Sequence, residues 1–86
     1  MVTQSDDQRG ALRRALRRAR KDSGMTQSEV AALLSMPQSF VSKYEAGQRR
    51  LDLVELLALC AALRTDLQSL LLLFETELTK DKKNEA

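Results

Sequence analysis

Apolar residues along this chain recur mainly at spacings of three and four, and short polar breaks divide them into five stretches. Such spacing is typical of amphipathic helices, whereas a half-buried strand would alternate. The first stretch predicts a helix from Arg9 to about Ser23, with Gly24 as its C-terminal stop. The apolar positions of this helix are Ala11, Leu12, Ala15, Leu16 and Ala19.

Two short helices with a tight turn between them are predicted next. Thr26 and Glu29 stand in the S/T-x-x-E relation of a capping box, which predicts a helix over residues 27–34. Pro37 then disfavours helical backbone in the residue before it and is well tolerated at a helix start. We therefore expect another helix over residues 37–46, ended by Gly47.

The second of these short helices has two unlike faces. Val41 and Tyr44 point one way on a helical wheel, and polar side chains gather on the opposite side. These polar residues are Gln38, Ser39, Ser42 and Lys43. One face is expected to pack and the other to remain exposed and polar.

The last two predicted helices are the most apolar. Asp52 and Glu55 repeat the capping pattern and open a helix over residues 53–63, and Asp66 caps another over residues 67–79. The apolar side chains of the earlier helix are expected to close the core; they include Leu53, Val54, Leu56, Leu57, Cys60, Ala61 and Leu63.

The final helix carries more leucines than one buried stripe needs. Leu67, Leu70, Leu71 and Phe74 suffice for that stripe, so the surplus lies at its edge or beyond it. The surplus residues are Leu72, Leu73 and Leu78. Monomers rarely expose a contiguous apolar patch, so these residues predict a homodimer interface; the alternative is a core wide enough to absorb them.

The predicted fold class is all-α, a compact five-helix bundle. With 86 residues the chain forms one domain, and three Gly, one Pro and few β-branched residues favour helices over a sheet. Residues 1–8 are expected to be a flexible N-terminus, residues 9–79 the folded domain, and residues 80–86 a disordered charged tail.

Composition gives no support to catalysis or to a bound cofactor. The chain has no His, and its single Cys60 lies in an apolar run where a buried small hydrophobe is expected. No Gly-rich phosphate loop or paired carboxylate cluster is present, so we expect no catalytic residue, no metal site, no cofactor and no small-molecule ligand. The N-terminus lacks a secretory signal and no apolar run could span a membrane, so a cytoplasmic location is expected.

Charge is divided unevenly along the chain. Residues 1–50 hold ten Lys/Arg and five Asp/Glu, whereas residues 51–86 hold four and seven. The basic half contains the two short helices, as a protein would need if that side met a phosphate backbone. The basic residues of the first helix have two interpretations. They form a solvent-exposed face of the helix, or a subset of them, Arg17 and Lys21, contacts phosphates.

One continuous run resembles the phage-repressor-like family of helix-turn-helix proteins, also called the Cro-type or Xre family. The run is RKDSGMTQSEVAALLSMPQSFVSKYEAGQRRLDLVELLALCAALR, and the resemblance extends over about residues 12–73. It rests on an Arg ahead of a Gly, TQ opening one helix, S-x-V-S-x-Y-E-x-G closing the next, and a final pair of amphipathic helices. The resemblance implies a lambda-repressor-like DNA-binding domain whose third helix lies in the major groove.

The resemblance also implies roles for individual residues. Gln38, Ser39, Ser42 and Lys43 match base-contacting positions, and Gln and Lys suit adenine and guanine edges. Gln27, Arg49 and Arg50 match phosphate contacts, and Arg20 and Glu45 match a structural salt bridge. Phe40 is left with two interpretations, packing within the domain or contact with a thymine methyl group.

We therefore predict sequence-specific binding of double-stranded DNA by a small dimeric regulator, a repressor that occupies a pseudo-palindromic operator in the nucleoid. The alternative is an antitoxin or accessory domain that uses the same fold mainly to hold a partner protein. DNA binding that is lost when Gln38 and Lys43 are replaced would favour the first function, and binding insensitive to the third helix, with a co-purifying protein, the second.

Overall fold

The computed structural model describes residues 6–85, with side chains described for residues 7–80. This part of the chain contains five α-helices and no strand, which confirms the predicted fold class. The helices are α1 (Asp6–Asp22), α2 (Gln27–Leu33), α3 (Gln38–Glu45), α4 (Leu53–Ala62) and α5 (Leu67–Glu85).

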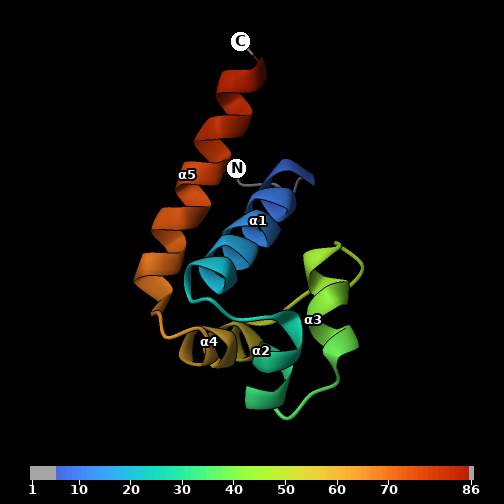
Figure 1. The fold of residues 1–86 in the computed structure, drawn as a ribbon. Helices are drawn as coiled ribbons and strands as arrows, with labels where there is room; N and C mark the ends of the chain where they lie inside the picture. Colours follow the sequence, from blue (N-terminus) through green and yellow to red (C-terminus); the bar gives the residue numbers. More distant parts are fainter. Residues whose placement is uncertain (1–5, 86) are drawn as a thin grey trace.

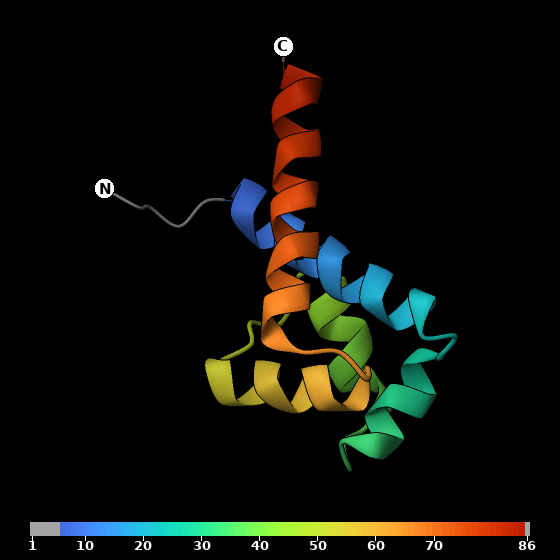
Figure 2. The same cartoon turned by 90° about the vertical axis from the view of Figure 1, so that its left-hand side faces the viewer.

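The helices form two closely packed pairs joined by a crossing helix (Figures 1 and 2). α1 packs mainly on α5, and α2 packs mainly on α3. α4 lies across the end of the bundle beside α2, and the far end of α5 projects beyond the other helices. This projection gives the molecule its long axis of 40 Å against 22 and 21 Å.

Both predicted capping boxes are present. The Glu29 backbone N–H donates to Thr26 Oγ1 at 3.1 Å, and the Thr26 N–H donates to Glu29 Oε1 at 2.9 Å. Asp52 and Glu55 make the same reciprocal pair at the start of α4. These side chains satisfy backbone donors that a helix start leaves without partners. Because each pair lies within three residues, the starts of α2 and α4 could be predicted from the sequence.

The turn between α2 and α3 differs in detail from the prediction. Pro37 occupies the N-cap position with extended backbone, so the helix begins at Gln38 rather than at Pro37. Ser35 supplies the reversal of direction with φ of 55°, a left-handed conformation uncommon for a residue with a side chain. Arg64 does the same between α4 and α5, with φ of 58°.

Two helix ends also lie outside the predicted bounds. α1 begins at Asp6, three residues before the expected start, and α5 continues to Glu85, where a disordered tail was expected. A buried ion pair helps to explain the longer α5: Glu77 Oε1 lies 3.0 Å from Arg14 Nε of α1, and Glu77 Oε2 lies 3.1 Å from Lys80 Nζ. The expected flexibility of residues 1–5 and of Ala86 concerns positions outside the described residues.

The core lies where the five helices meet. Its largest fully buried side chains are Tyr44, Leu16, Leu59, Leu63, Leu70, Val30 and Val41. No single helix in the described part is long and apolar enough to cross a membrane, although α4 and residues 67–80 of α5, bent by 101°, would suffice together by length and composition. Among the side chains described, those of residues 7–80, there is no cluster of three or more His, Cys, Asp or Glu that could bind a metal.

Candidate nucleic-acid interface

α3 buries one face and exposes the other. Phe40, Val41 and Tyr44 are buried against the core. Gln38, Ser39 and Lys43 are exposed, and Ser42 is half-buried with its hydroxyl donating to the Ser39 carbonyl oxygen at 3.2 Å. The structure therefore brings the four predicted base-contacting residues together on the polar side of one short helix.

A chain of hydrogen bonds connects this polar side to the interior. The Gln38 Nε2 group donates to Gln27 Oε1 at 2.8 Å, and Gln27 Nε2 donates to Glu45 Oε1 at 3.0 Å. Glu45 in turn accepts two hydrogen bonds from Arg20, at 2.7 Å from Nε and 3.0 Å from Nη2. Gln38 at the start of α3 is thus linked to α1 through side chains of α2 and α3.

Arg20 and Glu45 form the ion pair that the resemblance implied. Their side chains are only 10% and 5% exposed, and Arg20 Nη1 also donates to the Met25 carbonyl oxygen at 2.9 Å. The hydrogen bonds that Arg20 donates to the Glu45 carboxylate raise the pKa of Arg20 above its ordinary value despite burial. The pair joins α1, the start of α2 and the end of α3.

Gln27 has a different setting from the one that the sequence indicated. It was predicted as a phosphate contact, but its side chain is half-buried and bridges Glu45 and Gln38. One N–H of its amide is used in this bridge. The bridge was missed because its partners lie 11 and 18 residues away, and no local pattern reveals such a contact.

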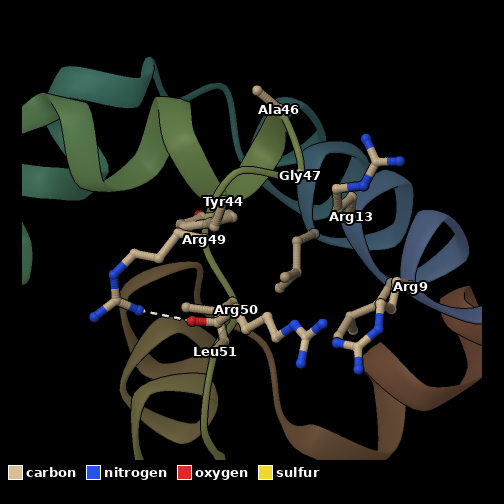
Figure 3. Close-up of a pocket in the computed structure, with 10 residues that line it drawn as sticks. Arg9, Arg13, Tyr44, Ala46, Gly47, Arg49, Arg50 and Leu51 are labelled. Atoms are coloured by element: carbon tan, nitrogen blue, oxygen red, sulfur yellow. Dashed lines mark hydrogen bonds between the residues drawn. The ribbon is translucent and has the colours of Figure 1, made fainter. Parts of the chain in front are cut away.

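Arg49 and Arg50, the predicted phosphate contacts of the loop after α3, differ in their surroundings. The Arg49 guanidinium makes two hydrogen bonds with the Glu55 carboxylate, at 3.1 and 2.7 Å, and lies 4.6 Å from the centre of the Phe40 ring. This contact raises the pKa of Arg49 and lowers that of Glu55. Arg50 is exposed and extends in another direction (Figure 3).

Phe40 packs within the domain. It is 7% exposed, and its ring meets the Tyr44 ring edge to face with centroids 5.6 Å apart. Arg49 covers the ring from the loop side. The structure therefore favours the packing interpretation over contact with a thymine methyl group.

The surplus leucines of α5 are exposed to different degrees. Leu72 is 63% exposed, whereas Leu73 and Leu78 are half-buried and Leu73 packs on the core. The expectation that the apolar side chains of α4 close the core is wrong for four of them, because Leu53, Val54 and Leu57 are 61%, 76% and 47% exposed and Ala61 is exposed too. α4 is apolar on nearly every side, so periodicity could not tell which of its faces would be buried.

The family model described as helix-turn-helix matches residues 16–70. The chain belongs to the Xre family of helix-turn-helix proteins. It is 45% identical to an XRE-family like protein from Pseudomonas syringae pv. tomato str. DC3000, over 80% of this chain and 84% of that one, with a TM-score of 0.73. Proteins of this family are DNA-binding transcription regulators. No curated protein sequence matches the chain.

Two further solved structures are similar to this Xre-family chain. The restriction-modification controller protein C.AhdI from Aeromonas hydrophila is 32% identical over 72% of this chain and 94% of its own, with a TM-score of 0.67. The clp gene regulator ClgR from Corynebacterium glutamicum is 27% identical over 91% of this chain and 83% of its own, with a TM-score of 0.83. Both likenesses extend over all or most of the helix-turn-helix domain.

Proposed function

We propose that this Xre-family protein binds double-stranded DNA sequence-specifically, with α3 in the major groove. The observation that carries the proposal is the setting of Gln38, which is exposed at the first position of α3 while Gln27 holds its amide. Its oxygen and remaining N–H can then meet adenine N6 and N7 as a bidentate pair. Because the amide is already oriented, less side-chain freedom is lost on binding.

The other predicted contacts divide into two groups. Ser39, Ser42 and Lys43 are proposed to face base edges, with Lys43 donating to guanine O6 or N7. Arg50 is proposed as the main phosphate contact of the loop, since Arg49 is held by Glu55 and its charge is partly compensated there. Gln27 is proposed to offer its remaining N–H to a phosphate at the start of α2.

We propose that the protein acts as a homodimer. The exposed apolar side chains of α4 and α5, Val54 and Leu72 above all, support this state, because a second copy could cover them. Leu73 and Leu78 would lie at the edge of the contact. A two-fold dimer would present two copies of α3 about 34 Å apart, to a pseudo-palindromic operator.

The proposed biological role is repression of transcription in the cytoplasm, by occupation of a promoter in the nucleoid. The names of C.AhdI and ClgR, a controller protein and a gene regulator, support transcription control in general. A promoter–reporter fusion tests the sign directly, since repression requires the reporter signal to fall when the protein is expressed.

Selection of bound sites from a random duplex pool, followed by fluorescence titration, tests DNA reading. We expect two related half-sites and an affinity that falls steeply with salt. Gln38→Ala should weaken operator binding by about 1–3 kcal/mol and relax the choice at one base pair of each half-site. Gln68→Ala, an exposed Gln on α5, is the matched control and should leave binding unchanged.

The second candidate function is that of an antitoxin or accessory domain that holds another protein. The exposed apolar residues of α4 favour it, because they suit a foreign partner as well as a second copy. A protein that co-purifies with the chain, together with binding that is insensitive to Gln38→Ala, would support this function. An enriched operator whose binding depends on Gln38 would contradict it.

A further inference from the structure

One arginine of the loop between α3 and α4 contacts three parts of the protein at once. The Arg49 guanidinium donates from Nη1 to Glu55 Oε1 at 3.1 Å and from Nη2 to Glu55 Oε2 at 2.7 Å, so both carboxylate oxygens are used. Its Nη1 also donates to the Arg50 carbonyl oxygen at 2.8 Å (Figure 3). The same group lies 4.6 Å from the centre of the Phe40 ring. A single side chain therefore joins α4, the loop and α3.

The contact with Glu55 has the geometry of an ordered ion pair. Two N–H groups in parallel fix the plane of the guanidinium relative to the carboxylate, which a single hydrogen bond does not do. The side chains of Arg49 and Glu55 are 37% and 27% exposed, so water competes for the pair only in part. Glu55 is itself held, because its Oε1 accepts the backbone N–H of Asp52 at 2.9 Å. Arg49 is thus bound to a carboxylate whose position the capping box of α4 fixes.

Phe40 connects this contact to the start of α3. It is the third residue of that helix, two residues after Gln38 and next to Ser39. Its ring is 7% exposed and contacts both the Tyr44 ring and the Arg49 guanidinium. A cation over an aromatic face is attracted to it, so Arg49 stabilises the buried position of this ring. Loss of Arg49 would uncover the side chain that anchors the first turn of α3.

The hydrogen bond to the Arg50 carbonyl oxygen fixes the backbone from which the Arg50 side chain extends. Figure 3 shows the two arginines leaving the loop in different directions, with Arg49 turned toward its acceptor and Arg50 extending the other way. Arg50 is the exposed one of the two and is the proposed phosphate contact. The Arg49 guanidinium therefore holds the backbone of a residue that is proposed to bind DNA.

We propose that Arg49 and Glu55 are positioning residues for DNA binding, which hold Arg50 and, through Phe40, the start of α3, without contacting phosphate themselves. This inference rests on the proposed function, and it gives Glu55 a role that the sequence did not indicate. A carboxylate beside a loop that meets phosphates repels them, so Glu55 should weaken DNA binding unless it holds other groups in place. The two possible roles of Arg49 therefore predict opposite effects of removing the charge of Glu55.

Glu55→Gln separates the two roles. The amide keeps an oxygen for the Asp52 N–H, since Gln also serves at this position of a capping box, but it loses the charge that holds Arg49. If Arg49 is a phosphate contact, the released guanidinium should bind DNA more tightly. If it is a positioning residue, the affinity for the operator selected from the random pool should fall about fivefold, although the protein has become more positive. Fluorescence titration of the full chain at several salt concentrations measures this affinity.

Glu29→Gln is the matched control. Glu29 has the same place in the capping box of α2, so the substitution removes the same charge and retains the same cap. Its carboxylate accepts the Thr26 backbone N–H at 2.9 Å, whereas that of Glu55 accepts both a backbone N–H and the Arg49 guanidinium. Operator affinity of Glu29→Gln should therefore equal that of the wild type or exceed it. Thermal unfolding of both variants checks that the fold is retained.

The salt dependence distinguishes Arg49 from Arg50. Each phosphate that a protein neutralises on duplex DNA adds about 0.9 to the slope of log affinity against log salt concentration, so Arg50→Gln should lower the slope by about 0.9. Arg49→Gln should weaken operator binding about as much as Glu55→Gln and leave the slope close to that of the wild type. The double variant Arg49→Gln with Glu55→Gln should bind no more weakly than either single variant, because the two side chains act as a unit.

Three results would overturn the proposal. The first is an operator affinity of Glu55→Gln that equals or exceeds that of the wild type; if thermal stability falls at the same time, the pair is structural only. The second is equal weakening by Glu29→Gln, and the third is a slope that falls by about 0.9 in Arg49→Gln. Gln38→Ala belongs in the same series of titrations. Binding that is insensitive to Gln38 would count against the proposed function, whereas the comparison of Glu55→Gln with Glu29→Gln decides this inference.

Discussion

Gln38 is exposed at the start of α3, but its amide is held by neighbouring side chains. The hydrogen bonds continue from Gln38 through Gln27 and Glu45 to Arg20, whose guanidinium is nearly buried. Such an arrangement fixes α3 relative to α1, and with it the orientation of Gln38, the side chain proposed to contact a base. A substitution at Arg20 should therefore affect DNA specificity as well as stability, although Arg20 lies away from the polar side of α3.

A double-mutant cycle at Arg20 and Glu45 tests the energetic part of this statement. Arg20→Met or Glu45→Leu alone should lower the free energy of unfolding by about 3 kcal/mol, because each leaves a charge buried without its partner. The double variant should lose clearly less than the sum, as measured by urea denaturation.

Arg18→Met provides the control for that cycle. Arg18 and Asp22 form an exposed pair at 3.8 Å, so its loss should change stability by less than about 1 kcal/mol. Purely additive effects of the two substitutions at Arg20 and Glu45 would show that the pair is not coupled.

Tyr44 gives a second prediction at the residue scale. Burial, with the charge of Glu45, raises the pKa of its hydroxyl well above the ordinary value of about 10. The folded state then keeps a proton that the unfolded chain loses, so this contribution to stability is present below pH about 10 and is lost as pH rises further. We expect tyrosinate absorbance at 295 nm to appear together with the loss of helical circular dichroism; tyrosinate formation in a folded chain would contradict this.

At the scale of elements, local chemistry explains which features the sequence could predict. The capping pairs at Thr26 and Asp52 act within three residues, so the starts of α2 and α4 follow from sequence alone. The hydrogen bond of Gln27 to Glu45 and the ion pair of Arg49 with Glu55 depend on how elements meet. Because such contacts cannot be predicted from local sequence, Gln27 and Arg49 were predicted as phosphate contacts without their partners Glu45 and Glu55.

The contact between α1 and α5 contains a buried carboxylate that no local pattern indicated. Glu77 is 7% exposed and accepts hydrogen bonds from Arg14 and Lys80. Burial acts to raise its pKa, but these two cations outweigh burial and hold the pKa of Glu77 below its usual value. The side chain is therefore charged in the folded protein at neutral pH.

This ionisation predicts a pH dependence of the α1–α5 contact. A depressed pKa contributes stability that is present above the unfolded pKa of about 4.3 and is lost as pH falls through the folded value. Glu77→Gln should therefore flatten the fall in stability below pH about 4.5, as measured by thermal unfolding at several pH values. Glu75→Gln, exposed on the same helix, is the control, and an equal effect of both substitutions would refute this role of Glu77.

At the scale of the whole molecule, the basic and apolar surfaces lie on different elements. The proposed DNA contacts come from α2, α3 and the loop after α3, whereas the exposed apolar residues come mainly from α4 and α5. A second copy can thus cover the apolar residues without covering α3. This separation is what a two-fold operator complex requires, because each α3 must stay accessible in the dimer.

The proposed homodimer gives the last prediction. Val54→Asp places a charge at the most exposed of the large apolar residues, at 76% exposure, and should shift the protein toward monomer by about tenfold or more in dissociation constant, measured by sedimentation equilibrium. Because the residue is exposed in the monomer, the fold should tolerate the change. Because one α3 would contact only a half-site, the loss of dimerisation in Val54→Asp should also lower the affinity for the operator. Leu33→Asp, at a 63% exposed position at the end of α2, is the matched control for dimerisation. A dimer that survives Val54→Asp and Leu72→Asp together would place the interface elsewhere, and a wild-type protein that is monomeric at all concentrations would contradict the proposed dimer.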